Sequence, residues 1–235
     1  MAIKSGRLKW YGLSFGLKQP SVESLSSRLE SLCFLPDLDI SHGFKIESVG
    51  NNYLSAKFIS KTTIEQKISL PTGGEFFQSI TDISTVDFVI EKYDSFYVRV
   101  ENPPRSMLLL FNNIAQAFDY ECSIEPVEVD VSAVLSLLKN GLDSVAVTYM
   151  DVSSISLGHG VQLRVAAAGD VGVEEELEIL LAGKGSVIEG VKLKYIGDGE
   201  FRSVEITRRA GLKIIRAMPD VEFEVFRVAL TQSRL

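Results

Sequence analysis

The feature that most constrains the fold of this chain is a short-period alternation of apolar and polar residues. It recurs in runs such as FKIESV from Phe44, YLSAKFIS from Tyr53 and TIEQKISL from Thr63, and the turn-forming segment GNN separates the first two. Because successive side chains of a β-strand point to opposite faces, a period of two predicts strands with one buried face. Short strands that are joined by turn residues predict a mainly antiparallel sheet.

The same pattern predicts a first strand within residues 3–17 and a hairpin farther along the chain. The hairpin is the segment VDFVIEKYDSFYVRVE from Val86, with its turn at Tyr93-Asp94-Ser95. The segment PTGGEFFQS from Pro71 predicts a loop instead, because proline and paired glycines interrupt strands.

Helical periodicity is confined to about four segments. In the first, Val22, Leu25 and Leu29 form one stripe, and Ser21 is of a residue type that caps helix N-termini. The other three helices are predicted within residues 103–118, 130–141 and 170–183. The sequence therefore predicts an α+β fold, a mainly antiparallel β-sheet with about four helices.

The C-terminal segment VEFEVFRVAL, residues 221–230, is predicted as a strand because it begins with regular alternation. The alternation breaks at Val225-Phe226, which indicates either a bulge or burial of both faces. A terminal strand of this kind is expected to complete a sheet, either inside the fold or across a dimer interface.

A chain of 235 residues is long enough for two domains. No linker rich in Pro, Gly or Ser separates them, so we expect two closely packed lobes, residues 1–126 and residues 127–235, each of α+β structure. One continuous domain is the alternative.

The composition is that of a globular protein, with 46% hydrophobic and 23% charged residues and a formal net charge of −7. No run of apolar residues is long enough to span a bilayer, and the N-terminal residues do not form a signal peptide. Cys33 and Cys122 lie far apart and outside any metal-binding motif, so we expect reduced thiols, with a disulfide between them as the alternative. These features predict a soluble, cytoplasmic protein that does not bind membranes.

His42 and His159 are the only histidines, and each precedes a glycine and an alternating run. They could meet to bind a metal or relay protons, but neither lies in a motif with metal-ligand spacing. We favour a structural interpretation, in which the glycine after each histidine allows another segment to approach the backbone closely.

No motif for phosphate-loop, dinucleotide, serine-hydrolase or metallopeptidase chemistry is present, so no cofactor and no metal site are predicted. One weaker pattern indicates a metal-dependent nuclease: Glu65 and Lys67 on one strand face, with Asp37 before them. The simpler interpretation places Glu65 and Lys67 on the solvated face of a strand whose other face is apolar. The question of enzymatic activity stays open, and a non-enzymatic role is favoured.

Charge is distributed unevenly along the chain. Basic residues gather between positions 192 and 216, whereas residues 106–138 contain acidic residues and no basic one. The basic set comprises Lys192, Lys194, Arg202, Arg208, Arg209, Lys213 and Arg216. Such a face could bind nucleic-acid phosphates, dock on a complementary surface of a protein partner or of a second copy, or simply be solvated.

No resemblance to a known family emerges from these residues. The sequence favours a non-enzymatic macromolecular interaction protein, an accessory or adaptor subunit that acts through contacts with a protein partner or through self-association. The alternative is a nucleic-acid-binding factor, less favourably a nuclease, that uses the basic face between residues 192 and 216.

Overall fold

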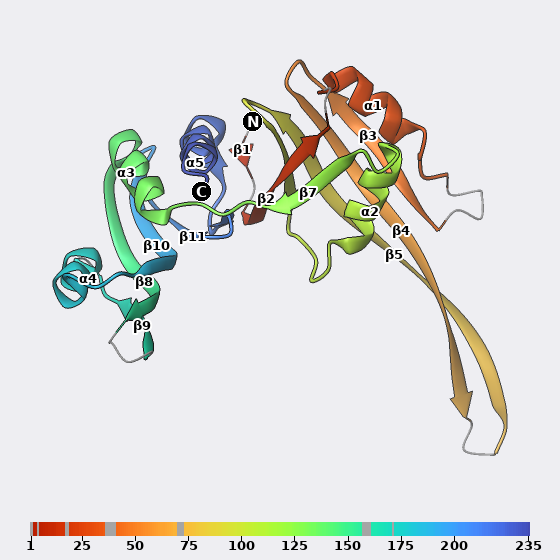
Figure 1. Ribbon diagram of the computed structural model, residues 1–235. Helices are drawn as coiled ribbons and strands as arrows, with labels where there is room; N and C mark the ends of the chain where they lie inside the picture. The colour runs from red at the N-terminus through yellow and green to blue at the C-terminus, as the bar shows by residue number, and fades with distance from the viewer. Residues whose placement is uncertain are drawn as a thin grey trace. The chain divides into compact units, whose positions relative to one another are not determined.

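Antiparallel β-strands make up most of the regular structure, and five helices pack on them (Figure 1). The computed structural model describes residues 2–235 except 4, 17–18, 36–40, 70–72, 157–160 and 171. The predicted α+β class is confirmed, but these described residues form five helices rather than about four.

The chain divides into two compact units. One, here called the terminal unit, consists of Met1–Tyr11 and Glu125–Leu235, and the other, the hairpin unit, is Gly12–Ile124. Strand β2, Gly6–Phe15, contributes residues to both. The predicted lobes at residues 1–126 and 127–235 stay a prediction.

The hairpin unit is built on a meander of four antiparallel strands. In chain order these are β3 (His42–Val49), β4 (Tyr53–Ser69), β5 (Glu75–Lys92) and β6 (Phe96–Glu101). The turn between β5 and β6 falls at the predicted position, where the amide of Tyr93 donates to the carbonyl of Ser95 at 2.9 Å.

Two of the predicted boundaries in this meander are wrong. The runs that begin at Tyr53 and Thr63 are one strand, because the residues between them pair with β5 without interruption. Residues 75–79, predicted within a loop, begin β5. Lys61 and Thr62 carry no turn preference, so continuous cross-strand pairing extends the strand through them.

Helices α1 (Val22–Glu30) and α2 (Leu108–Ala117) belong to the hairpin unit, and the short strand β7 (Cys122–Pro126) follows them. Ser21 caps α1 as predicted, since its Oγ accepts a hydrogen bond from the Ser24 amide at 3.2 Å. Helix α1 packs on β3 and β4, where Leu25, Leu29 and Phe44 are buried. This helix therefore covers the core of the unit.

The terminal unit holds a six-stranded sheet in the order β9-β8-β10-β11-β12-β2, in which every pairing is antiparallel. Its strands besides β2 are β8 (Asp143–Ser156), β9 (Gln162–Ala168), β10 (Val187–Gly197), β11 (Glu200–Thr207) and β12 (Gly211–Ile214). A separate small ladder pairs β1 (Ala2–Ile3) with β13 (Met218–Pro219).

Three helices cover one face of the terminal unit's sheet: α3 (Val131–Gly141), α4 (Val173–Leu181) and α5 (Asp220–Gln232). From the sheet, Trp10 stacks on Phe223 and Tyr195 packs on Phe226, so both aromatic pairs join strands to α5. We call this the covered face and the opposite one the open face.

The prediction of a strand at residues 221–230 is wrong, because these residues form most of α5. The buried apolar side chains, Phe223, Phe226, Ala229 and Leu230, follow helical spacing. The alternation breaks at Val225-Phe226 because buried residues in a helix recur every three or four positions, not every two. The terminal strand that we expected to complete a sheet, inside the fold or across a dimer interface, is therefore a helix.

Candidate interaction surfaces

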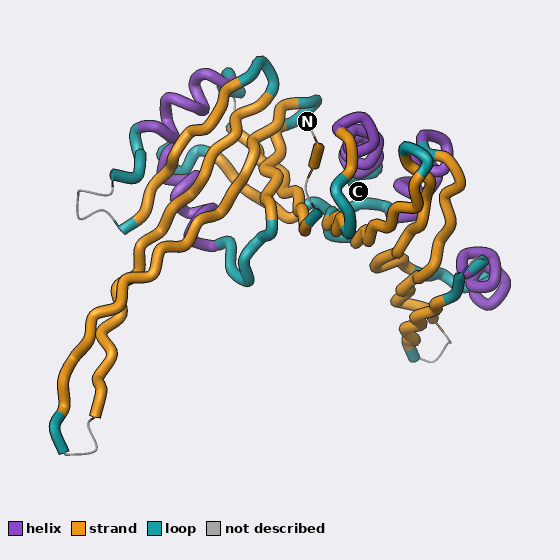
Figure 2. Tube along the Cα trace, turned by 180° about the vertical axis from the view of Figure 1, so that it is seen from behind, coloured by secondary structure: helices purple, strands orange, loops and turns teal. Residues whose placement is uncertain are grey.

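Strands β4 and β5 continue beyond the other strands of the hairpin unit as a two-stranded ribbon (Figure 2). The last residue of β4 that pairs with β3 is Ser60, and the pairing of β5 with β6 involves only residues 88–92. Residues 61–69 and 75–83, here called the arm, pair only with each other among the strands that the structure describes.

The two faces of the arm differ in chemistry. Register places Ile64 opposite Ile80 and Ile68 opposite Phe76, with a Gln66–Gln78 pair between them, and we call this side the apolar face. The described residues of the hairpin unit leave it largely uncovered, since Ile64 is 57% exposed, Phe76 45% and Ile80 44%. Isolated two-stranded ribbons are marginally stable, and uncovered apolar patches mark contact sites.

The other side of the arm, the charged face, carries the residues of the weak nuclease pattern. Glu65 and Lys67 share this face as predicted, and both are exposed. Lys67 pairs with Glu75 on the facing strand at 2.7 Å. Asp37 lies outside the described residues. Within the described residues, no group of three His, Cys, Asp or Glu side chains could hold a metal ion.

The His42-Gly43 step has the structural role that we favoured from the sequence. A Cβ at Gly43 would lie 2.6 Å from the backbone nitrogen of Phe34 and 2.8 Å from the carbonyl oxygen of Leu32. This close approach lets Phe44 exchange two backbone hydrogen bonds with the segment after α1. The His42 ring contacts the Ser41 hydroxyl at 2.8 Å, and His159 lies outside the described residues.

A second surface is the open face of the terminal unit's sheet. One row across the strands consists of Tyr149, Lys192, Glu205, Lys213 and Arg7. In this row Glu205 pairs with Lys213 at 3.0 Å and with Lys192 at 3.7 Å. The neighbouring row consists of Asp151, Gly190, Thr207, Gly211 and Lys9, so its centre has almost no side chains.

Between these rows the open face is hollowed, with a volume of about 920 Å³. Five cations and three carboxylates line the hollow. They are Lys9, Arg164, Lys192, Lys194, Arg209, Asp151, Glu189 and Glu205. The hollow therefore carries more positive than negative side chains, although the net charge of the whole chain is negative.

The seven basic residues predicted as a binding face do not share one surface. Lys192, Lys194 and Lys213 lie on the open face, Arg209 lies in the turn between β11 and β12, and Arg216 is exposed after β12. Register instead pairs Arg202 with Tyr195 of the covered face, and the Arg202 guanidinium lies 3.3 Å from Glu222 of α5.

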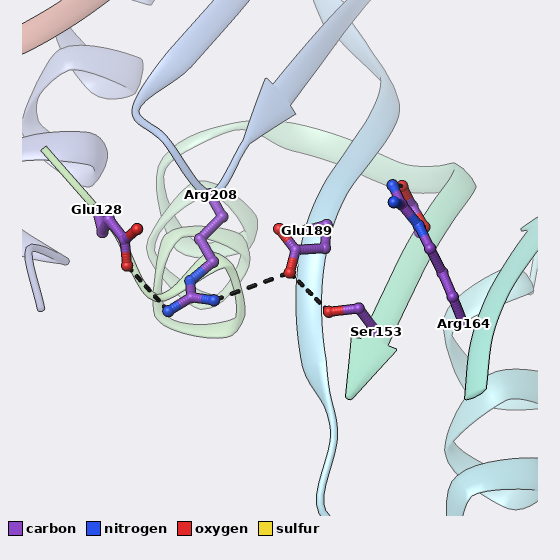
Figure 3. A network of polar contacts seen from close by, with 6 residues as sticks. Glu128, Ser153, Arg164, Glu189 and Arg208 are labelled. Atoms are coloured by element: carbon purple, nitrogen blue, oxygen red, sulfur yellow. Dashed lines mark hydrogen bonds and ion pairs between the residues drawn. The ribbon is translucent and has the colours of Figure 1, made fainter. Parts of the chain in front are cut away.

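Arg208 is held by an ion-pair network (Figure 3). Its guanidinium donates to Glu128 at 2.9 Å and lies 3.8 Å from Glu189, which also accepts a hydrogen bond from Ser153 at 2.6 Å. These contacts join the segment before α3 to β8 and β10. Arg208 thus links parts of the terminal unit.

Three pKa values reflect these surroundings. Burial lowers the pKa of Lys9, and the nearby Arg209 guanidinium lowers it further. Hydrogen bonds from Arg164 lower the pKa of Asp151. On the covered face, burial raises the pKa of Tyr195, and a hydrogen bond of 3.0 Å to Glu222 adds to the rise.

The sequence interpretation missed two parts of these surfaces. Phe76 and Ile80 were not assigned to an apolar face because glycine and proline nearby indicated a loop. The N-terminal Lys9 was noted as basic but not placed beside Arg209, since that neighbourhood depends on the pairing of β2 with β12.

The chain matches no protein-family model, and no curated protein matches it either. None of the helices in the described residues has the length and apolar character that crossing a membrane requires.

Proposed function

We propose that this protein is a non-enzymatic interaction protein, an accessory or adaptor subunit of the cytoplasm, and that it binds its partner through the arm. The observation that carries the proposal is the apolar face, where Ile64, Ile68, Phe76 and Ile80 lie in one stripe and all but the half-buried Ile68 are exposed. Free Cys33 and Cys122 support a reducing compartment.

The charges of the arm favour a protein partner over a nucleic acid. The arm carries two basic residues, Lys61 and Lys67, and three acidic ones, Glu65, Glu75 and Asp82. A ribbon that follows a phosphate backbone needs an excess of positive charge, which the arm lacks. Nucleic-acid binding by the basic residues between positions 192 and 216 stays the alternative.

The partner that fits the apolar face best is a second copy of this chain. A two-fold interface brings the same patch together from both subunits, so the patch must be complementary to itself. The central residues of the apolar face are uncharged, and its one carboxylate, Asp82, lies toward the base of the arm. Two arms can therefore stack face to face, as sheets do in a sandwich, without opposing like charges.

Analytical ultracentrifugation over a range of concentrations tests this proposal. The apolar face offers only four large apolar side chains per arm, so we expect a dimer that dissociates in roughly the micromolar range. The double variant Ile64→Gln with Ile80→Gln is expected to stay monomeric. Phe77→Gln with Ile83→Gln, which removes apolar side chains from the charged face, is expected to dimerise like the wild type.

A wild-type protein that is monomeric at every concentration would overturn self-association through the arm. Equal weakening by both double variants would overturn it as well, because the contact would then not be specific to the apolar face.

A further inference from the structure

The hollow on the open face contains carboxylates that already have partners. Asp151 accepts a hydrogen bond of 2.8 Å from Arg164, and Glu205 accepts bonds of 3.0 Å from Lys213. Glu189 contacts Arg208 and Ser153. Each acidic group of the hollow is therefore neutralised by a neighbouring donor.

Three cations of the hollow remain without a carboxylate. Among the described residues, no Asp or Glu oxygen forms an ion pair with Lys9, Lys194 or Arg209. Lys9 and Arg209 also lie near each other, because Lys9 pairs with Gly211, two residues after Arg209. Burial lowers the pKa of the Lys9 amine, and the Arg209 guanidinium lowers it further. Placing like charges side by side costs free energy, and a bound anion would recover it.

The floor of the hollow gives a ligand access to the sheet backbone. Gly190 and Gly211 flank Thr207 in the row that ends at Lys9. Gly190 lines the hollow and carries no side chain that would cover the strand there. Tyr149, 37% exposed, also lines the hollow and offers a ring for stacking.

We propose that this hollow binds the phosphate group of a nucleoside phosphate, held by Lys9 and Arg209, which register places at the same end of it. Arginine and lysine are the side chains that bind phosphate in proteins, and arginine donates to it in a bidentate fashion. The volume of about 920 Å³ is within the range of small-ligand sites. The phosphate can belong to a free nucleotide or to a nucleic-acid strand, and the proposal does not depend on the arm.

Isothermal titration calorimetry with ADP, with inorganic phosphate and with a short single-stranded oligonucleotide tests the proposal. The variant Lys9→Ala with Arg209→Ala is expected to bind ADP at least about tenfold more weakly than the wild type, since two charge-assisted contacts are lost. The control, Lys184→Ala with Arg234→Ala, removes two exposed cations of the same unit that do not line the hollow and is expected to bind like the wild type.

The probes separate the two sources of phosphate. Binding of ADP with no gain for the oligonucleotide indicates a free nucleotide, whereas tighter, steeply salt-dependent binding of the oligonucleotide indicates a strand. Each result supports the phosphate site if the Lys9 and Arg209 variant weakens it. Arg209→Ala alone, measured with a thermal unfolding control, provides a second test if the double variant does not fold. Failure of all three probes to bind, or wild-type affinity in these variants, would overturn the proposal.

Discussion

The apolar face of the arm and the open face of the terminal unit's sheet are both uncovered, but they differ in what they expose. The arm exposes isoleucine and phenylalanine, whose burial requires another apolar surface. The open face exposes lysine and glutamate, which water solvates without a partner. An uncovered sheet face thus indicates a protein contact when it is apolar, and indicates a ligand only where its charges are unbalanced.

The sharpest form of this comparison lies within one hairpin. Near the core, Phe88 of β5 is 1% exposed, whereas Phe77 of the same strand is 69% exposed. Phe88→Ala is expected to lower the free energy of unfolding by about 3–5 kcal/mol, because it leaves a cavity. Phe77→Ala is expected to change it by less than about 0.5 kcal/mol.

Urea unfolding of both variants, at a concentration where the protein is monomeric, measures this difference. A loss of similar size for Phe77→Ala would break the comparison, since it would mean that the arm is already packed in the monomer.

A smaller loss of unfolding free energy is expected at Gly43, where the covered part of the hairpin unit has no space for a side chain. Gly43→Ala places a Cβ against backbone atoms at 2.6–2.8 Å, and backbone cannot move aside as a flexible side chain can. We expect it to cost about 1–3 kcal/mol of unfolding free energy. Gly16→Ala is the control, because no atom lies within 4 Å of its Cβ, and its thermal unfolding should match that of the wild type. Equal stability of the two variants would contradict the close approach at Gly43.

The smallest expected change in unfolding free energy comes from Tyr195, on the covered face of the terminal unit, at alkaline pH. The pKa of Tyr195 is raised in the folded protein, so this group contributes fully to stability below its unfolded pKa of about 10 and loses that contribution as the pH rises further. Unfolding free energy is expected to fall above about pH 10 by up to roughly 1.4 kcal/mol per pH unit from this group.

Tyr195→Phe should reduce this decline, and Tyr149→Phe on the open face should not. Chemical unfolding at about pH 9 and about pH 11 measures both. If Tyr195→Phe retains the full decline, the covered face does not protect its hydroxyl.

Local signals in the sequence predicted the α+β class, the Ser21 cap and the turn at Tyr93–Ser95. They did not predict α5, because the segment VEFEV alternates like a strand and its helical spacing becomes clear only with Phe226 and Ala229. They also did not predict the length of β4 and β5, which depends on pairing across a five-residue segment that contains a proline and two glycines. Both errors arise where tertiary contacts decide between two local patterns.

The basic residues show a limit of a different kind. Arg202 was grouped with Lys192 because both belong to the same cluster of basic residues. However, Arg202 is an even number of residues from the buried Val204 and Ile206, so strand alternation assigns its side chain to the covered face. That signal was available in the sequence. The neighbourhood of Lys9 and Arg209 was not, because it requires knowing that the first long strand pairs with one of the last.

Because β4 and β5 pair without interruption along the arm, residues can be removed from both strands in pairs to shorten it. Removing two residues from each strand would shorten the reach by about 7 Å and leave the apolar face pointing the same way. Removing one residue from each strand, such as Thr62 with Asp82, would turn every residue beyond that pair to the opposite side. Sequence changes that alter the arm by whole dipeptides can thus tune its span without changing the surface it presents, and changes by single residues reverse that surface.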